Sequence, residues 1–248
     1  MTLPYDATSL LRRDGAQIID AGQRAGLDAD VPSCEGWTMS DLLWHMSEVW
    51  TFWRFIVNND VTTSDQLAEF PEIPRVADDV LVDWTTAALT GLHAALTSTP
   101  PTTEVWTWTG SPQDVWWVRR RMAHETAVHR WDAERVVGDP FEIWSLVASD
   151  GIDEFLHFFA PRNRSEPLPG TVHLHCTDTT PEENGEWIIH RLEPGRIDVD
   201  RAHVKGDAAI RGSANDLLLW LWGRDGMDVD IVGDEALALE LRNGSDRS

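Results

Sequence analysis

The sequence is poor in cysteine, in basic residues and in long apolar runs. Its two cysteines, Cys34 and Cys176, form no CxxC motif and exclude a disulfide framework, so both are expected to be free thiols. Only 20 Lys and Arg stand against 42 Asp and Glu, which gives a net charge of -22. Such a field repels phosphate backbones and anionic membranes. We therefore expect neither nucleic acid nor a membrane as partner.

No apolar run approaches the roughly 20 residues that span a bilayer, and residues 1–13 lack the apolar core of a secretion signal. A cytoplasmic location is therefore expected. The chain also has no internal repeat and no low-complexity segment. With 248 residues, 42% of them hydrophobic, it can bury a core as one large domain or two small ones.

Helical periodicity dominates the chain up to about residue 165. Apolar residues recur at helical spacing over 6–25, 38–57, 77–96, 115–137 and 142–159. The segment 162–170 is polar and punctuated by Pro and Gly, as in a linker. This part of the chain, residues 1–165, is predicted to be a helical bundle.

After the linker the period changes to two. Strands are expected over 172–176, 186–192, 196–200 and 229–232. Ser213 is expected to cap a helix over 215–222 that Gly223 ends. The fold class is therefore predicted as α+β, with a small α+β domain over 166–248 that follows the bundle in the sequence.

His45 lies on the second predicted helix, which begins with an acidic variant of a capping box, Thr38 and Asp41. It shares the core-facing stripe with Leu42, Met46, Val49 and Trp53. Alone, a histidine on such a face is more often a hydrogen-bonded core residue than a ligand.

Glu125 and His129 lie one turn apart on the helix predicted over 115–137, about 40° from each other. Alone, the pair reads as an ordinary i,i+4 polar contact. His124 stands roughly 140° from His129, so the spacing is HExxxH and not the HExxH of zincins. With His45 the pair forms a metal-site pattern, because a buried carboxylate is costly and no inward-facing Lys or Arg is evident as a rival partner.

Three other features allow two interpretations each. His173 and His175 alternate on a predicted strand and can bind metal, but solvent-facing alternation is preferred. Cys34 is interpreted as a small packed residue, with a thiol at the edge of the site as the alternative. Core packing or an apolar wall at the site entrance explains a tryptophan cluster: Trp106, Trp108, Trp116 and Trp117.

The stretches CEGWTMSDLLWH (34–45) and RRMAHETAVHRWD (120–132) resemble the two signatures of the mycothiol-dependent maleylpyruvate isomerase family, in the DinB-like metalloenzyme superfamily. The resemblance covers most of the chain. It implies a DinB-like four-helix bundle with a small carboxy-terminal α/β domain, and a metal held by His45, Glu125 and His129. The segment DLLLWLWGR (216–224) is similar to a helix end bearing a functional arginine, which implies a catalytic role for Arg224. The alternative is a C-cap with a cation that complements the helix dipole.

Two His and one Glu leave an open position on a zinc-like divalent ion. A thiol bound there loses its proton and supplies the nucleophile that the chain lacks. The resemblance implies mycothiol, with S-transfer to a small electrophile or its cis/trans isomerisation as the reaction. Asp132 is a candidate to orient a ligand imidazole, and Arg224 a candidate to clamp a substrate carboxylate or the thiol cofactor.

Two other functions stay open: a metal-activated hydrolase, whose open position holds water, and a non-catalytic sensor of metal or thiol. Hydrolysis needs a general base near the metal, and no carboxylate beyond Glu125 itself is evident at helical spacing. A sensor keeps the trio but turns over no electrophile. The substrate pocket is expected to depend on loops such as 58–74.

Overall fold

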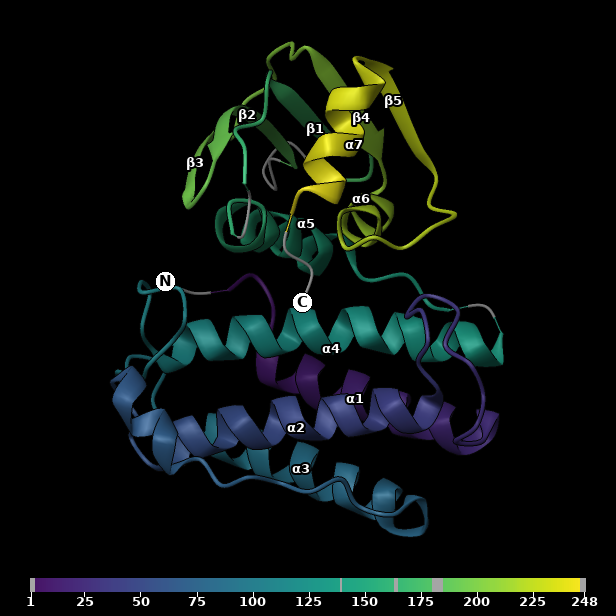
Figure 1. Ribbon diagram of the computed structural model, residues 1–248, viewed down its shortest axis with the longest axis vertical. Coiled ribbons are helices and arrows are strands. Elements are labelled where there is room, and N and C mark those ends of the chain that lie inside the picture. The colour runs from purple at the N-terminus through teal and green to yellow at the C-terminus, as the bar shows by residue number, and fades with distance from the viewer. Residues whose placement is uncertain (1–2, 139, 163–164, 180–184, 246–248) are drawn as a thin grey trace. The chain divides into compact units, whose positions relative to one another are not determined.

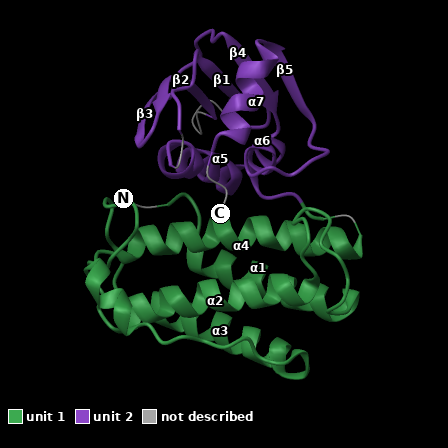
Figure 2. Ribbon diagram, in the orientation of Figure 1, with its two compact units in different colours: residues 1–141 green, residues 142–248 purple. Residues whose placement is uncertain are grey.

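The computed structural model describes residues 3–138, 140–162, 165–179 and 185–245. The chain divides into two compact units, Met1–Phe141 and Glu142–Ser248 (Figure 2). The first is helical and the second contains a five-stranded sheet. The predicted α+β class is therefore confirmed. None of the described helices has the length and apolar character needed to cross a membrane.

The helices of the first unit are α1 (Ala7–Ala25), α2 (Met39–Asn58), α3 (Asp78–Ser98) and α4 (Val115–Val137), with a short 3-10 turn, η1 (Ser64–Glu69), between α2 and α3 (Figure 1). Helix α1 packs along α4, and α2 along α3. The capping box at Thr38 and Asp41 is present and begins α2. All four predicted helices form within a residue or two of their expected ends, because caps and periodicity act locally.

Helices α2 and α4 run antiparallel where they meet. His45 contacts Glu125, and eight residues further along α2 the ring of Trp53 lies 5.6 Å from that of Trp117, eight residues earlier on α4. Leu42, Met46 and Trp50 are fully buried along the inner face of α2. The apolar stripe predicted for this helix therefore faces the core, and it brings His45 to the edge of that core.

The fifth predicted helix is α5 (Ser145–Glu154), continued by a π-helical turn, η2 (Phe155–Phe159). It belongs to the second unit, so the structural boundary lies between Phe141 and Glu142 and differs from the expected one near residue 165. The rings of Phe155 and Phe159 lie 5.1 and 4.7 Å from that of Trp222 in the same unit. Helical periodicity shows that a face is buried but does not show which core buries it, which is why the boundary was misplaced.

The sheet of the second unit has the strand order β3-β2-β1-β4-β5. Strand β1 pairs antiparallel with β2 and parallel with β4, while β3 and β5 are the antiparallel edges. The strands are β1 (Val172–Cys176), β2 (Glu186–Glu193), β3 (Arg196–Asp200), β4 (Ala208–Gly212) and β5 (Val229–Gly233). Helices α6 (Ala214–Leu221) and α7 (Glu235–Asn243) complete the unit. Sequence patterns predicted neither β4, which is short and rich in small residues, nor α7.

The preferred interpretation of His173 and His175 as solvent-facing residues is wrong for His173, which is buried. The apolar face of β1, formed by Val172, Leu174 and Cys176, is buried as predicted. Alternation along a strand separates two faces of a sheet, but it does not show whether the second face is covered by another segment.

Candidate metal centre

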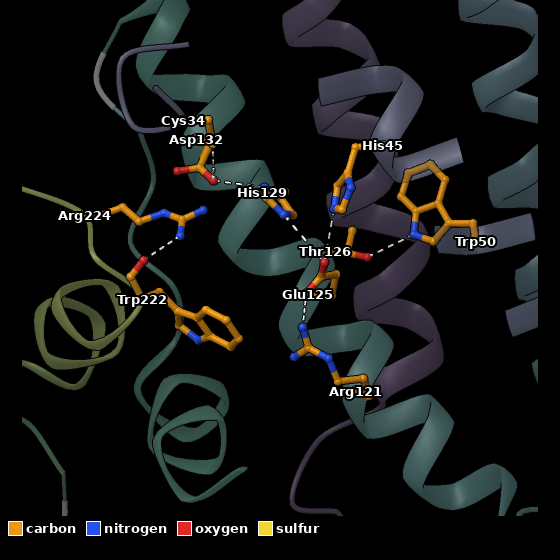
Figure 3. A network of polar contacts seen from close by, with 10 residues as sticks. All are labelled: Cys34, His45, Trp50, Arg121, Glu125, Thr126, His129, Asp132, Trp222 and Arg224. Atoms are coloured by element: carbon orange, nitrogen blue, oxygen red, sulfur yellow. Dashed lines mark hydrogen bonds and ion pairs between the residues drawn. The ribbon is translucent and has the colours of Figure 1, made fainter. Parts of the chain in front are cut away.

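His45 from α2 and Glu125 and His129 from α4 converge on one point (Figure 3). The Oε1 atom of Glu125 lies 3.4 Å from Nε2 of His45 and 3.6 Å from Nε2 of His129. The two imidazole rings are 5.0 Å apart and nearly perpendicular. Ligand atoms around a tetrahedral zinc ion are about 3.4 Å apart, given bonds of about 2.1 Å. The donor atoms of the trio therefore fit a divalent metal ion.

Glu125 also has a charge partner, Arg121, whose guanidinium contacts its other carboxylate oxygen, Oε2. Arg121 is buried and lies one turn before Glu125 on α4. The expectation that no inward-facing cation competes for this carboxylate is therefore wrong. Arg121 is four residues before Glu125 and His129 is four residues after it, so both lie on the same helix face as Glu125. The sequence spacing therefore already indicated that Arg121 can reach this carboxylate.

The contact with Arg121 changes the argument for a metal. Glu125 is not an uncompensated buried carboxylate, so charge balance alone does not require a cation. What supports a metal instead is the division of the carboxylate: Oε2 faces Arg121, while Oε1 faces the two imidazoles. Oε1 is thus directed toward the same point as the two imidazole nitrogens, while Arg121 holds Oε2 in place.

Asp132 contacts the far side of the His129 ring, with Oδ2 3.0 Å from Nδ1, and its side chain is fully buried. The predicted role of Asp132 in orienting this imidazole has the required geometry. A carboxylate that accepts from Nδ1 fixes the tautomer in which Nε2 carries the lone pair. In His129 it is Nε2 that faces Glu125.

Cys34 lies at the edge of this site. Its sulfur is 3.6 Å from the same Asp132 oxygen that contacts His129. The structure therefore favours the alternative of a site-edge thiol over a purely packed residue. Cys176 is different, because burial, with a smaller effect of the Asp178 carboxylate, raises its pKa to about 12. At neutral pH Cys176 is a protonated thiol.

The aromatic wall of the site is Trp37, which the sequence interpretation missed. Its ring lies 5.0 Å from the ring of His45 and is stacked at 6.4 Å on that of His129. Its position directly before the N-cap of α2, inside the signature that ends at His45, was the available signal.

For the tryptophan cluster, the sequence favoured core packing and offered a wall at the site entrance as the alternative. Trp117 is fully buried and packs against Trp53 and Trp108, while Trp106 packs against Phe52. Trp53 lies about 12 Å from His45 along α2, given the rise of a helix. For Trp117, core packing is the interpretation that the structure supports.

His124 lies apart from the trio, as the HExxxH spacing predicts. It is buried, and its Nε2 is 2.8 Å from the hydroxyl of Tyr5. The helix phasing that excluded a zincin site is therefore confirmed.

Arg224 follows the end of α6. Gly223 has a φ of +85°, and the guanidinium Nη1 of Arg224 donates to the carbonyl oxygen of Trp222 at 2.8 Å. This is the C-cap arrangement that the sequence offered as one alternative. A catalytic role for Arg224 stays a prediction.

Two family models match the chain. Residues 9–134 match the mycothiol maleylpyruvate isomerase N-terminal domain, and residues 147–240 match the MDMPI C-terminal domain. No curated protein is significantly similar in sequence.

Two solved structures have a similar fold. One is the crystal structure of the mycothiol-dependent maleylpyruvate isomerase, with a TM-score of 0.58 and 14% identity over 93% of this chain and 95% of that one. The other is a mutant of the same enzyme in which alanine replaces a histidine, with a TM-score of 0.61 and 15% identity over the same shares of each chain.

Proposed function

The chain belongs to the mycothiol maleylpyruvate isomerase family, and from this membership we propose that it is a metal-dependent enzyme acting with a low-molecular-weight thiol, mycothiol. Its reaction is the cis/trans isomerisation of a small electrophile, or S-transfer to it. The observation that carries the proposal is the convergence of Glu125 Oε1 with Nε2 of His45 and of His129.

The trio would hold a divalent ion, zinc above all, through two imidazole nitrogens and one carboxylate oxygen. When bound, such an ion lowers the pKa of a coordinated thiol and so supplies a thiolate at neutral pH. The chain's own residues prepare this site. Asp132 sets the tautomer of His129, and Arg121 fixes the second oxygen of Glu125.

The nucleophile is proposed to come from outside the chain. Cys176 is buried and protonated, and Cys34 donates to Asp132. In an isomerisation the thiol sulfur bonds to one alkene carbon while the π electrons move onto the conjugated carbonyl. The remaining single bond rotates, and departure of the sulfur restores the double bond. In S-transfer the sulfur stays and a leaving group such as halide departs.

Arg224 is proposed to bind a carboxylate of the substrate or of the thiol. A guanidinium offers paired N–H donors that match a carboxylate, and Nη1 is already oriented by the Trp222 carbonyl. Arg224→Ala is expected to reduce turnover more than about 10-fold while metal content stays unchanged. A loss of metal as large as the loss of turnover would contradict this assignment.

The metal assignment is tested by elemental analysis of purified full-length variants. His45→Ala, Glu125→Gln and His129→Ala should each remove about one divalent ion per chain relative to the unmodified protein. His124→Gln, a buried histidine on the same helix, is the matched control and should keep the full content. Full metal content in all three trio variants would refute the site.

The thiol requirement is tested by turnover of maleylpyruvate or a halogenated aromatic with and without mycothiol. Activity should need the added thiol, also in a Cys34→Ser variant. In cobalt-loaded protein the thiol should produce a sulfur-to-metal charge-transfer band that Glu125→Gln abolishes. Thiol-free cleavage of esters or amides would instead identify a hydrolase. Absence of both activities, with a cobalt spectrum indifferent to thiols, would identify a sensor.

A further inference from the structure

A second group of metal-ligating side chains lies in the other unit, on the face of the sheet opposite Val172, Leu174 and Cys176. His173 and His175 share this face of β1, since they are two residues apart on a strand. Glu186 is paired directly with His175 in the antiparallel register of β1 and β2, so it lies on the same face.

The topology of the sheet brings a third histidine to this face. Strand β3 is an edge strand beside β2, whereas β4 lies on the far side of β1. The segment 201–207 joins β3 to β4 and must therefore cross β2 and β1. His203 is in the middle of this segment. Its ring lies 5.4 Å from the ring of His173 and 5.9 Å from that of His175.

The distances among the four residues centre on the Glu186 carboxylate. Oε2 lies 3.1 Å from Nε2 of His173 and 2.6 Å from Nδ1 of His203. Oε1 lies 3.7 Å from Nδ1 of His175. One ligand atom from each residue lies within 4.8 Å of all the others. A tetrahedral ion with bonds of about 2.1 Å needs ligand atoms about 3.4 Å apart, so small side-chain movements suffice.

The surroundings favour a cation over a purely structural cluster. His173 is buried, with 8% of its side chain exposed, and it is surrounded by two further imidazoles and one carboxylate. Three imidazoles close together repel one another when protonated but share a metal ion as neutral ligands. The chain as a whole carries a net charge of -22, which attracts divalent cations.

We propose that His173, His175, Glu186 and His203 bind a divalent transition-metal ion of the zinc class, at a site that shares no residue with the trio of His45, Glu125 and His129. Imidazole-rich donor sets select zinc and similar ions over magnesium and calcium. Four protein ligands fill a tetrahedral shell, as in structural sites. The ion pins the crossing segment 201–207 to the sheet through His203, whose side chain is 77% exposed.

The test uses full-length protein in which the trio is disabled by His45→Ala and His129→Ala. We expect this protein to bind one zinc ion in competition with a chelator. Adding Glu186→Gln or His203→Ala should weaken binding about 100-fold or more, since loss of a direct ligand costs at least as much as loss of its outer-shell partner. The His203 side chain is 77% exposed, so we expect its removal to leave the fold intact.

His190→Ala is the matched control. His190 lies on the same strand as Glu186 and also contacts a carboxylate, Asp200 at 3.2 Å, but it is outside the cluster. It should leave zinc affinity unchanged. Cobalt in the trio-disabled protein should give the visible absorption of a four-coordinate ion, lost with Glu186→Gln. Zinc should also raise the melting temperature of that protein and not of its His203→Ala derivative.

The proposal is overturned if the trio-disabled protein binds no zinc, or if Glu186→Gln and His203→Ala bind it as tightly as their parent. A hydrogen-bonded His–Glu network without metal would give that result. Its failure is separable from failure of the proposed function. If the otherwise unmodified protein loses a zinc ion with Glu186→Gln but loses none with Glu125→Gln, the site in the sheet is supported and the site of His45, Glu125 and His129 is refuted.

Discussion

Among single side chains, Asp132 offers the sharpest test of how the site is prepared. Oδ2 of its buried carboxylate lies 3.0 Å from Nδ1 of His129. Asp132→Asn should weaken metal binding about 10- to 100-fold, because an amide fixes neither the tautomer nor the basicity of the ring. Chelator competition measures this affinity. Equal affinities in the two proteins would show that Asp132 is merely a packing residue.

His124 and Tyr5 form a buried pair that is separate from the group of His45, Glu125 and His129. His124→Gln and Tyr5→Phe should each lower the free energy of unfolding by about 1 kcal/mol, the usual net value of a hydrogen bond. Neither should change metal content. Urea unfolding and elemental analysis of the same samples separate the two effects. Loss of metal in His124→Gln would mean that α4 is rotated relative to the described phasing.

Helix α2 is the element that carries His45, and its capping box makes its stability depend on pH. Hydrogen bonds from the backbone and side chain of Thr38, and then from Arg75, lower the pKa of Asp41 to about 2 from a usual value of 3.8. The ionised carboxylate therefore stabilises the folded state above about pH 4, and this contribution is lost as the pH falls toward 2.

Asp41→Asn removes this titration. At neutral pH the variant should lose about 1 kcal/mol of stability, as for other helix caps. Between pH 4 and 2 its stability should fall less steeply than that of the unmodified protein, as urea midpoints will show. Thr38→Ala removes the hydroxyl hydrogen bond to Asp41 but keeps the bond from the backbone N–H, so it should flatten the profile only in part. An unchanged slope in both variants would exclude the capping box as a source of acid sensitivity.

Over the whole molecule the dominant property is the net charge of -22 at pH 7. Self-repulsion of this size opposes the compact state, and salt screens it over a Debye length of about 10 Å at 0.1 M. Raising NaCl from about 0.02 to about 0.5 M should therefore raise the melting temperature at pH 7. Near the sequence pI of about 4.6 the shift should disappear. A fall in melting temperature with salt at pH 7 would show that attractive ion pairs outweigh the repulsion.

Much of this architecture is readable from local patterns. The four helices of the bundle, the capping box of α2 and most strands follow from caps, turns and periodicity, which act over a few residues. Helix geometry likewise placed Glu125 and His129 on one face and His124 on another. These relations depend on a turn of 3.6 residues and on nothing distant in the chain.

Other features depend on which distant segments pack together. Helix α5 groups with the sheet unit because it packs along α6 and because Phe155 and Phe159, in the turn η2 that continues it, pack against Trp222, although its periodicity is like that of the bundle helices. His173 is covered because segment 201–207 must cross β2 and β1 to reach β4, and β4 itself was not recognised. Long-range packing selects such partners, and periodicity carries no record of it.

The two candidate metal sites show the same difference between what local sequence determines and what long-range packing determines. For the trio, two of the proposed ligands are one helix turn apart and the third lies in a recognisable capped helix, so the sequence is sufficient to name all three. For the histidine cluster of the sheet, His203 is 30 residues from His173 and lies outside every helix and strand. Its place beside β1 depends on the order and direction of the strands, because β3 and β4 run in the same direction and the segment between them has to return across β2 and β1.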